Sequence, residues 1–198
     1  MRILRSSDYR IMPWKNGGGT TTEIFVAPEN AGLSGQPFDW RVSIADVAGD
    51  GPFSPFPGYD RHIMAIEGRG MMLEGGPQGA IGLTRPFVPR TFSGDWTISG
   101  RLVSGPARDF NLMVRRDRYE SRLEMHEAAS ALRLDAASST LLIHLFDGEL
   151  TTAGHLLAAG ETLILDPGEA TIARPLAGPT RLALCRITLR SSPPPPTP

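Results

Sequence analysis

The sequence is poor in cysteine and lysine, with one residue of each, Cys185 and Lys15, among 198 residues. A single cysteine excludes an intramolecular disulfide framework, so the fold must rest on packing and hydrogen bonds. We expect Cys185 to be a buried structural thiol, because an unpaired cysteine usually behaves as a small hydrophobic side chain.

Long apolar runs and an excess of one charge are also missing. No stretch reaches the roughly 18 consecutive apolar residues of a membrane-spanning helix, and charges interrupt the N-terminus before a signal-peptide core can form. We therefore expect a cytoplasmic protein without a membrane partner. The formal net charge of -1 gives no reason to expect nucleic acid as a partner.

Glycine and proline are abundant, at 22 and 18 residues, and they are spread along the chain. Such frequent interruption is hostile to long helices and favours many short strands joined by turns, which predicts an all-β fold. The C-terminus differs, because five of the last six residues are proline. Residues 191–198 are therefore predicted to form a flexible, extended tail.

Alternating side chains locate the strands. In residues 40–47 bulky apolar side chains alternate with small or polar ones, as in a strand with two different faces. Residues 20–27 are rich in threonine and β-branched residues and also predict a strand. Residues 63–66 and 71–73 predict a hairpin, and residues 119–134 are predicted as a strand that bridges two halves of the chain.

The two halves share a weak internal repeat. Residues 64–68, Met-Ala-Ile-Glu-Gly, resemble residues 145–148, Leu-Phe-Asp-Gly, because in both an apolar strand ends in an acidic residue and a glycine. Two similar β-barrels in one chain would produce such a pattern. We expect an antiparallel N-terminal barrel at residues 1–118 and a C-terminal one at residues 119–190.

Longer motifs connect the chain with a known family. They are Met12 to Thr20 with Glu23, Phe38 to Ala45, Gly51 to Ser54 with Phe56, Gly58 and Arg61, and Asp109 to Asn111 with Arg115. In these motifs the chain resembles the HutD/Ves family of two-cupin (bicupin) proteins, from residue 1 to about residue 190. The resemblance implies two cupin-like β-barrels, a link to histidine breakdown, and a ligand-binding or regulatory role.

Many cupins hold a metal ion through histidines and a carboxylate, which suit Fe, Mn or Zn. The four histidines of this chain are His62, His126, His144 and His155, and none lies in a His-x-His pair. If residues 64–68 correspond to the strand that follows the cupin metal motif, Ser54, Phe56 and Arg61 fall roughly at ligand positions, and Thr171 falls near the third histidine. An arginine cannot ligate a cation, so we expect neither a metal nor another cofactor.

The single lysine lies in residues 14–20, Trp-Lys-Asn-Gly-Gly-Gly-Thr, while all other basic residues are arginine. Retention of Lys15 suggests a place where a compact ammonium is needed, although chance explains it equally well. Three glycines allow close approach of a ligand and leave N–H groups free for an anion. A tight loop that closes the end of a barrel explains the glycines as well.

Polar residues on otherwise apolar strands extend this candidate site. Arg41 and Ser43 share one face of a strand, and Asn111 interrupts another apolar strand. A charged side chain that points inward must be paired or bind something. The predicted ligand-binding residues are Lys15, Asn16, Glu23, Arg41, Ser43, Ser54, Arg61 and Asn111.

If these strand faces line one barrel, Lys15, Arg41 and Arg61 form a cationic pocket, and Glu23 is a candidate for holding an amine or cation. Internal salt bridges, Arg41 with Glu23 or Arg61 with Asp109, are the alternative. Charge-assisted hydrogen bonds contribute roughly 1.5–3 kcal/mol each. Two or three of them would support micromolar binding, which requires about 8 kcal/mol.

The residues thus predict a metal-independent protein that binds a small anionic metabolite. Through the family, formiminoglutamate and urocanate are the candidate ligands, and a sensor or regulatory role in histidine utilisation follows. A metal-independent isomerase or hydrolase acting on the same metabolite class stays open, with Glu23 and Lys15 as an acid–base pair. A structural or interaction module without ligand also stays open, as does a homodimer, and no catalytic residue is assigned.

Overall fold

The computed structural model describes residues 1–29, 31 and 37–191. Apart from one 3-10 helix, Ser6–Asp8, every helix or strand in this part of the chain is a β-strand, which confirms the all-β prediction. No helix among these residues has the length and apolar character needed to cross a membrane. The predicted tail lies outside the described residues except for Ser191.

The chain divides into two compact units between residues 118 and 119. Residues 10–118 form the N-terminal unit, and residues 1–9 join the residues after 118 in the C-terminal unit. The prediction that residues 1–118 belong together was therefore wrong for the first nine. The reason is strand pairing, because β1 (Arg2–Leu4) pairs antiparallel with β17 (Thr162–Leu165) of the C-terminal half.

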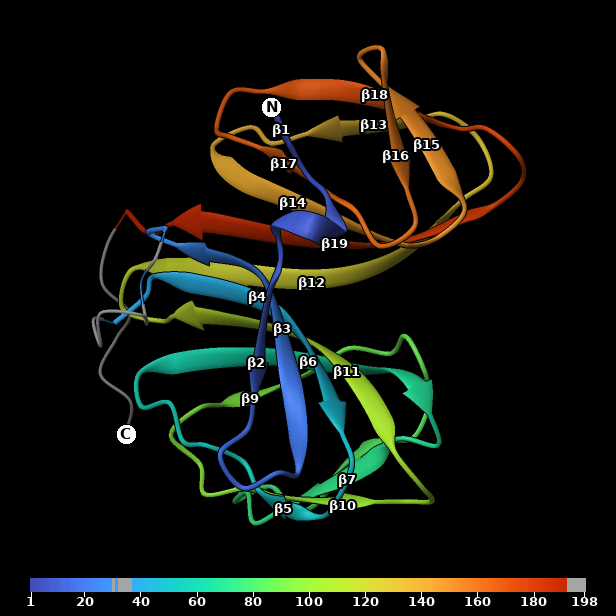
Figure 1. Ribbon diagram of the computed structural model, residues 1–198. Helices are drawn as coiled ribbons and strands as arrows, with labels where there is room; N and C mark the ends of the chain where they lie inside the picture. Colours follow the sequence, from blue (N-terminus) through green and yellow to red (C-terminus); the bar gives the residue numbers. More distant parts are fainter. Residues whose placement is uncertain (30, 32–36, 192–198) are drawn as a thin grey trace. The chain divides into compact units, whose positions relative to one another are not determined.

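The N-terminal unit contains two antiparallel sheets (Figure 1). The large sheet has the strand order β2-β3-β4-β11-β6-β9, and the small sheet has the order β5-β10-β7-β8. The strands are β2 (Arg10–Pro13), β3 (Gly19–Ala27), β4 (Trp40–Val47), β5 (Gly51–Pro52), β6 (Tyr59–Gly68), β7 (Met71–Glu74), β8 (Ile81–Leu83), β9 (Arg90–Ser93), β10 (Ser99–Leu102) and β11 (Ala107–Arg115).

The C-terminal unit is also built of two antiparallel sheets. Its large sheet has the order β1-β17-β14-β19-β12, and its small sheet has the order β13-β18-β15-β16. The remaining strands are β12 (Tyr119–Ala128), β13 (Leu132–Asp135), β14 (Ser139–Asp147), β15 (Glu149–Thr152), β16 (His155–Ala158), β18 (Ala170–Pro175) and β19 (Thr180–Leu189).

The two units repeat one strand order. In the large sheets β4-β11-β6-β9 corresponds to β12-β19-β14-β17, and in the small sheets β5-β10-β7-β8 corresponds to β13-β18-β15-β16. The weak sequence repeat thus marks a repeat of topology. Closed barrels are not formed, however, because each sheet of the described residues has a linear strand order with two edge strands.

The repeat extends to the end of one strand in each unit. The β6–β11 ladder shifts register beside Gly68, and the β14–β19 ladder shifts register beside Gly148. Both glycines have a left-handed backbone, with φ of 80° and 79°. A Cβ at Gly68 would lie 2.4 Å from the carbonyl oxygen of Pro106, and a Cβ at Gly148 would lie 2.9 Å from Oγ1 of Thr180. Both positions therefore favour glycine.

Two strand predictions need correction. Residues 63–66 and 71–73 do not form a hairpin, because β6 pairs with β11 and β9 whereas β7 pairs with β10 and β8. Left-handed glycines at Gly68 and Gly70 lead the chain from the large sheet into the small one. Residues 119–134 likewise form two strands, β12 and β13, in different sheets.

The interiors of the two units differ in polarity. The C-terminal unit is filled by aliphatic side chains, among them Leu141, Ile143 and Leu145, which alternate along β14. Cys185 in this unit is fully buried as expected, and burial raises the pKa of its thiol. Among the described residues, the buried Asp, Glu and Arg side chains are Glu23, Arg61 and Asp109, and all three belong to the N-terminal unit.

Candidate functional site

A cavity of about 490 Å³ lies in the N-terminal unit. Residues from β2, β3, β4, β5, β6 and β11, the turn after β2 and the segment after β5 line it. In Figure 1 the turn between β2 and β3 reaches the end of the unit where β5 and β10 lie. Seven of the eight predicted ligand-binding residues are in the lining, namely Lys15, Asn16, Arg41, Ser43, Ser54, Arg61 and Asn111.

Strand alternation and register explain how residues distant in sequence meet. Met113 of β11 lies opposite Arg41 of β4 on one side and Arg61 of β6 on the other. Two residues along, Asn111 lies opposite Ser43. Because side chains alternate along a strand, these rows project from one face of the large sheet, and that face forms a wall of the cavity.

Arg61 is the most deeply placed cation of this wall. Its side chain lies among three aromatic rings, with the guanidinium carbon 5.3, 5.8 and 5.0 Å from the centroids of Phe53, Phe56 and Phe92. Its polar contacts are long, at 3.4 Å to the carbonyl oxygen of Ser54 and 3.4 Å to Oδ1 of Asn111.

The charge of Arg61 is buried without a contacting carboxylate. The residue is 6% exposed, its Nε has no hydrogen-bond partner, and it forms no ion pair with any carboxylate of the described residues. Burial lowers the pKa of Arg61 to about 10, so the guanidinium stays protonated at neutral pH. A buried cation in this state requires compensation by an anion.

Asp109 lies close to Arg61 but is separated from it by Asn111. Asn111 donates from Nδ2 to Oδ1 of Asp109 over 2.9 Å, and its own Oδ1 accepts from Arg61. The other oxygen of Asp109, Oδ2, is buried and has no hydrogen-bond partner in the described part of the chain. Burial raises the pKa of Asp109 to about 6, against the opposing effects of Asn111 and Arg61.

Glu23 does not line the cavity. Its carboxylate accepts two arginines, with Oε1 2.8 Å from Nη2 of Arg10 and Oε2 2.7 Å from Nε of Arg41. Of the two internal salt bridges considered from the sequence, Arg41 with Glu23 therefore exists and Arg61 with Asp109 does not. Glu23 holds Arg41 at the cavity wall, which leaves its carboxylate little capacity for an amine ligand.

The turn that carries Lys15 closes one end of the cavity. Trp14 donates from Nε1 to Oγ1 of Thr21 over 2.8 Å, and the amide of Gly17 donates to the carbonyl of Trp14 over 3.1 Å. The amide of Gly18 donates to Oδ1 of Asn16 over 3.0 Å. Two of the three glycine amides are thus used within the turn, which favours the tight-loop interpretation over an anion-binding nest.

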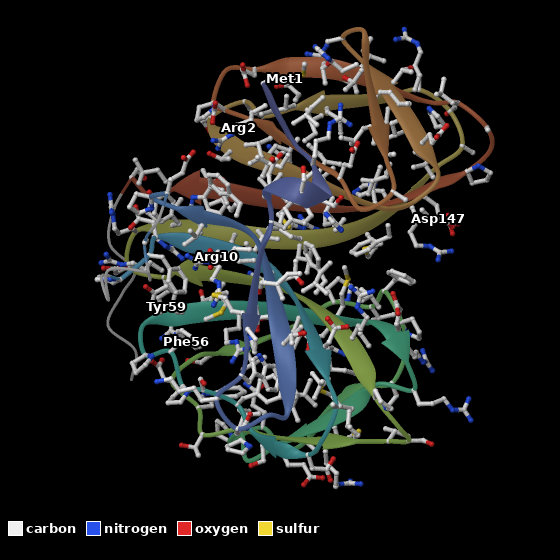
Figure 2. All side chains as sticks on the ribbon, viewed as in Figure 1. Met1, Arg2, Arg10, Phe56, Tyr59 and Asp147 are labelled. Carbon is white, nitrogen blue, oxygen red and sulfur yellow. The ribbon has the colours of Figure 1, made fainter. Side chains whose placement is uncertain are left out.

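The predicted ligand-binding residues did not include the aromatic lining or Asp109, which was considered only as an ion-pair partner of Arg61. Trp14, Phe53 and Phe56 line the cavity, and Phe53 and Phe56 also enclose Arg61. Figure 2 shows Phe56 beside Tyr59, and the two rings meet edge to face with centroids 6.2 Å apart. Asp109 was detectable, because it lies two residues before Asn111 on the same strand and therefore on the same face.

The lining does not fit a metal ion. No group of three or more His, Cys, Asp or Glu side chains in the described part of the chain is arranged to hold one. The lining residues at the aligned ligand positions are Ser54, Phe56 and Arg61. Thr171 lies in the C-terminal unit, where its hydroxyl is 2.7 Å from that of Thr152. None of the four histidines lines the cavity.

Comparison with known proteins gives consistent matches. A family model described as HutD matches residues 6–184. The chain is 43% identical over 145 residues to the "Uncharacterized 21.2 kDa protein in hutC 3'region" of Pseudomonas putida, covering 72% of each. It is 41% identical over 122 residues to "Protein Ves" of Citrobacter koseri, covering 60% of this chain and 61% of that protein.

Solved structures agree with these matches. The structure of HutD from Pseudomonas fluorescens SBW25 in a formate condition is similar, with a TM-score of 0.78 and 37% identity, over 96% of this chain and 99% of that one. A cupin 2 conserved barrel domain protein from Leptotrichia buccalis has a TM-score of 0.56 at 11% identity, covering 89% of this chain and 92% of that one. The second similarity concerns the fold alone and identifies it as cupin-like.

Proposed function

Because the chain belongs to the HutD family, we propose that it binds a small carboxylate metabolite, without a metal ion, in the cavity of its N-terminal unit. The metabolic setting that we propose is histidine utilisation, with a sensor or regulatory role. Support for this setting comes from the relative in the hutC 3' region and from the structural relative named HutD. Formiminoglutamate and urocanate are the candidate ligands.

We also propose a two-cupin architecture for the chain. Each unit would be a cupin-like pair of sheets, and the common strand order of the two units supports this view. The two units would then have separate tasks. The aliphatic interior of the C-terminal unit supports stability, and the polar cavity of the N-terminal unit supports binding.

The observation that carries the proposed binding role is the buried guanidinium of Arg61. It is 6% exposed and lacks a contacting carboxylate among the described residues. Aromatic faces attract a cation but do not replace an anion, since a cation–π contact contributes only about 0.5–2 kcal/mol. A ligand carboxylate beside Arg61 would supply the missing charge and accept strong hydrogen bonds.

The cavity also suits a small molecule in size and lining. Its volume of about 490 Å³ lies within the roughly 300–1,000 Å³ of ligand pockets. Trp14, Phe53 and Met113 supply apolar surface for the body of a ligand. Arg61 at the wall and Lys15 at the turn supply positive charge at two places, which suits a metabolite with a carboxylate.

A metal-independent enzyme is the second candidate, and one observation favours it. Asp109 is a buried carboxyl at the cavity with a pKa raised to about 6, the property of a general acid or base. The pair considered from the sequence, Glu23 with Lys15, is less suitable because two arginines hold Glu23. Product analysis of the binding mixtures would separate an enzyme from a binding protein.

The test is calorimetric titration of the full chain with urocanate, formiminoglutamate, glutamate and histidine. Arg61→Met should weaken binding of the active ligand at least about thirtyfold, because loss of a buried charged contact costs roughly 2–5 kcal/mol. Arg85→Met, at an exposed arginine of the same unit, should bind as the unchanged protein does. Binding that Arg61→Met leaves intact, or no binding of any of the four compounds at millimolar concentration, would contradict the proposed function.

A further inference from the structure

Two buried polar atoms at the cavity wall have neither a hydrogen-bond nor an ion-pair partner among the described residues. One is a donor, Nε of Arg61, and the other is an acceptor, Oδ2 of Asp109. Both residues line the cavity, and Asn111 connects them through its two amide atoms. The wall therefore holds one unpartnered donor and one unpartnered acceptor on two residues that Asn111 joins, where a simple cation-binding or anion-binding site would hold only one.

This arrangement creates a conflict for an anionic ligand. A carboxylate that pairs with Arg61 would lie near Asp109, and two carboxylates at close range in a buried site cannot both stay ionised at little cost. In such pairs the usual solution is a proton shared between the two groups.

The other charges around Asp109 do not remove this conflict. On β4, Arg41 forms an ion pair with Glu23, and Asp46 adds negative charge near Asp109. On β6 the only charged residue in the lining is Arg61. The lining residues from β5 and the segment after it are Pro52, Phe53, Ser54 and Phe56, none of which has an ionisable side chain. Lys15 lies at the turn and is exposed.

We infer that Asp109 makes ligand binding proton-linked, so that the site takes up a carboxylate together with one proton held between a ligand oxygen and Oδ2 of Asp109. The inference rests on the proposed function, since it concerns the same cavity. The guanidinium of Arg61 pairs with the ligand carboxylate, and the proton comes from solvent. Asp109 thereby selects ligands that accept a hydrogen bond from its carboxyl group.

The consequence is a defined pH dependence of affinity. Below pH 6 most of the free protein already carries the proton on Asp109, because burial raises its pKa to about 6. Above that pH each unit of increase should raise the dissociation constant about tenfold, because the proton must be taken from an ever more dilute pool.

The experiment is calorimetry of the full chain with sodium acetate as the probe, from pH 5.5 to 8. At pH 7 it is repeated in Bis-Tris and in imidazole, whose ionisation enthalpies differ. The expected result is uptake of close to one proton per acetate at pH 7 and the tenfold loss of affinity per unit. Acetate binding without proton uptake and without pH dependence would overturn the inference while leaving the proposed function intact.

Two variants test whether the proton uptake depends on Asp109. Asp109→Asn keeps a hydrogen-bond donor but cannot titrate, so its acetate affinity should be constant across the range, with no proton uptake. Asp46→Asn is the matched control, because Asp46 is a nearby carboxylate with a half-exposed side chain, and it should keep the pH dependence. If Asp109→Asn does not fold, the buffer comparison on the unchanged protein still decides. No acetate binding at any pH would count against both the proposed function and this inference.

Discussion

At the residue scale, the cavity differs from the rest of the molecule in the state of its charges. Most ion pairs lie at the surface, whereas Arg61 and Asp109 are buried at close range without direct contact. Each is expensive to bury in its charged form. A folded protein keeps such groups when a ligand or a reaction uses them, and this is why we assign them the central roles.

Asp109 should therefore lower stability at neutral pH. Its folded pKa of about 6 lies above the ordinary value of 3.8, so the folded state binds the proton more tightly than the unfolded chain does. The stability that this proton gives is complete below pH 3.8 and is lost as the pH rises through 6. The difference amounts to about 3 kcal/mol at most. Asp109→Asn is expected to raise the free energy of unfolding at pH 7.5 by up to this amount and to change it little at pH 4. Urea unfolding at both pH values measures this, and equal effects at the two would contradict it.

Glu23, unlike Asp109, should raise the free energy of unfolding at neutral pH, because its carboxylate pairs with two arginines. Glu23→Gln leaves Arg10 and Arg41 without a carboxylate and is expected to cost about 2 kcal/mol. That is less than the roughly 3–5 kcal/mol of a fully buried pair, since Arg10 is partly exposed. Glu67→Gln is the control, because the pair of Glu67 with Arg108 is exposed and should contribute less than about 1 kcal/mol. Similar losses of unfolding free energy in Glu23→Gln and Glu67→Gln would show that the ion pairs of Glu23 contribute no more to stability than an exposed pair does.

At the element scale, a left-handed glycine marks the end of a corresponding strand in each of the two units. Gly68 and Gly148 end the corresponding strands β6 and β14 with nearly the same left-handed backbone. At Gly68 an added Cβ would meet backbone, whereas at Gly148 the nearest atom belongs to a threonine side chain. A side chain can move aside more easily than backbone.

An alanine series should separate these effects. Gly105→Ala, at a left-handed glycine with open space around it, should cost only the about 1–2 kcal/mol of the backbone conformation. Gly148→Ala should cost more than this, and Gly68→Ala should cost most, because the carbonyl of Pro106 blocks the new methyl group. Thermal unfolding of the three variants gives the order. A Gly68→Ala variant as stable as Gly105→Ala would show that the strand end is not constrained.

At the scale of the whole molecule, a ligand should stabilise the folded chain in proportion to its affinity. At a hundred times its dissociation constant, a ligand raises the free energy of unfolding by about 2.7 kcal/mol. The melting temperature should rise accordingly with the active metabolite and should not rise for Arg61→Met. Because no group of three or more His, Cys, Asp or Glu side chains among the described residues is arranged to hold a metal ion, EDTA should change neither the melting temperature nor the stabilisation by the ligand. A lower melting temperature, or a loss of the stabilisation by the ligand, after EDTA treatment would contradict the metal-independent proposal.

The sequence by itself determined the all-β class, the strand positions at residues 20–27 and 40–47, and the existence of a repeat. These depend on local alternation and on the spacing of glycine and proline, which a sequence records directly. It also indicated most of the polar residues that line the cavity, because a charged side chain on an apolar strand is visible as a break in the pattern. Their role in binding stays a prediction.

Only the tertiary structure decided which of these residues are free to act. Pairing across strands placed β1 in the C-terminal unit and led β6 and β7 into different sheets, and such long-range register is not encoded in local alternation. The tertiary structure pairs Glu23 with Arg10 and Arg41. It leaves Arg61 and Asp109 without an ion pair, and each has one unpartnered atom among the described residues. The physical reason is that the cost or use of a buried charge depends on its neighbours in space, and those neighbours come from strands far apart in the chain.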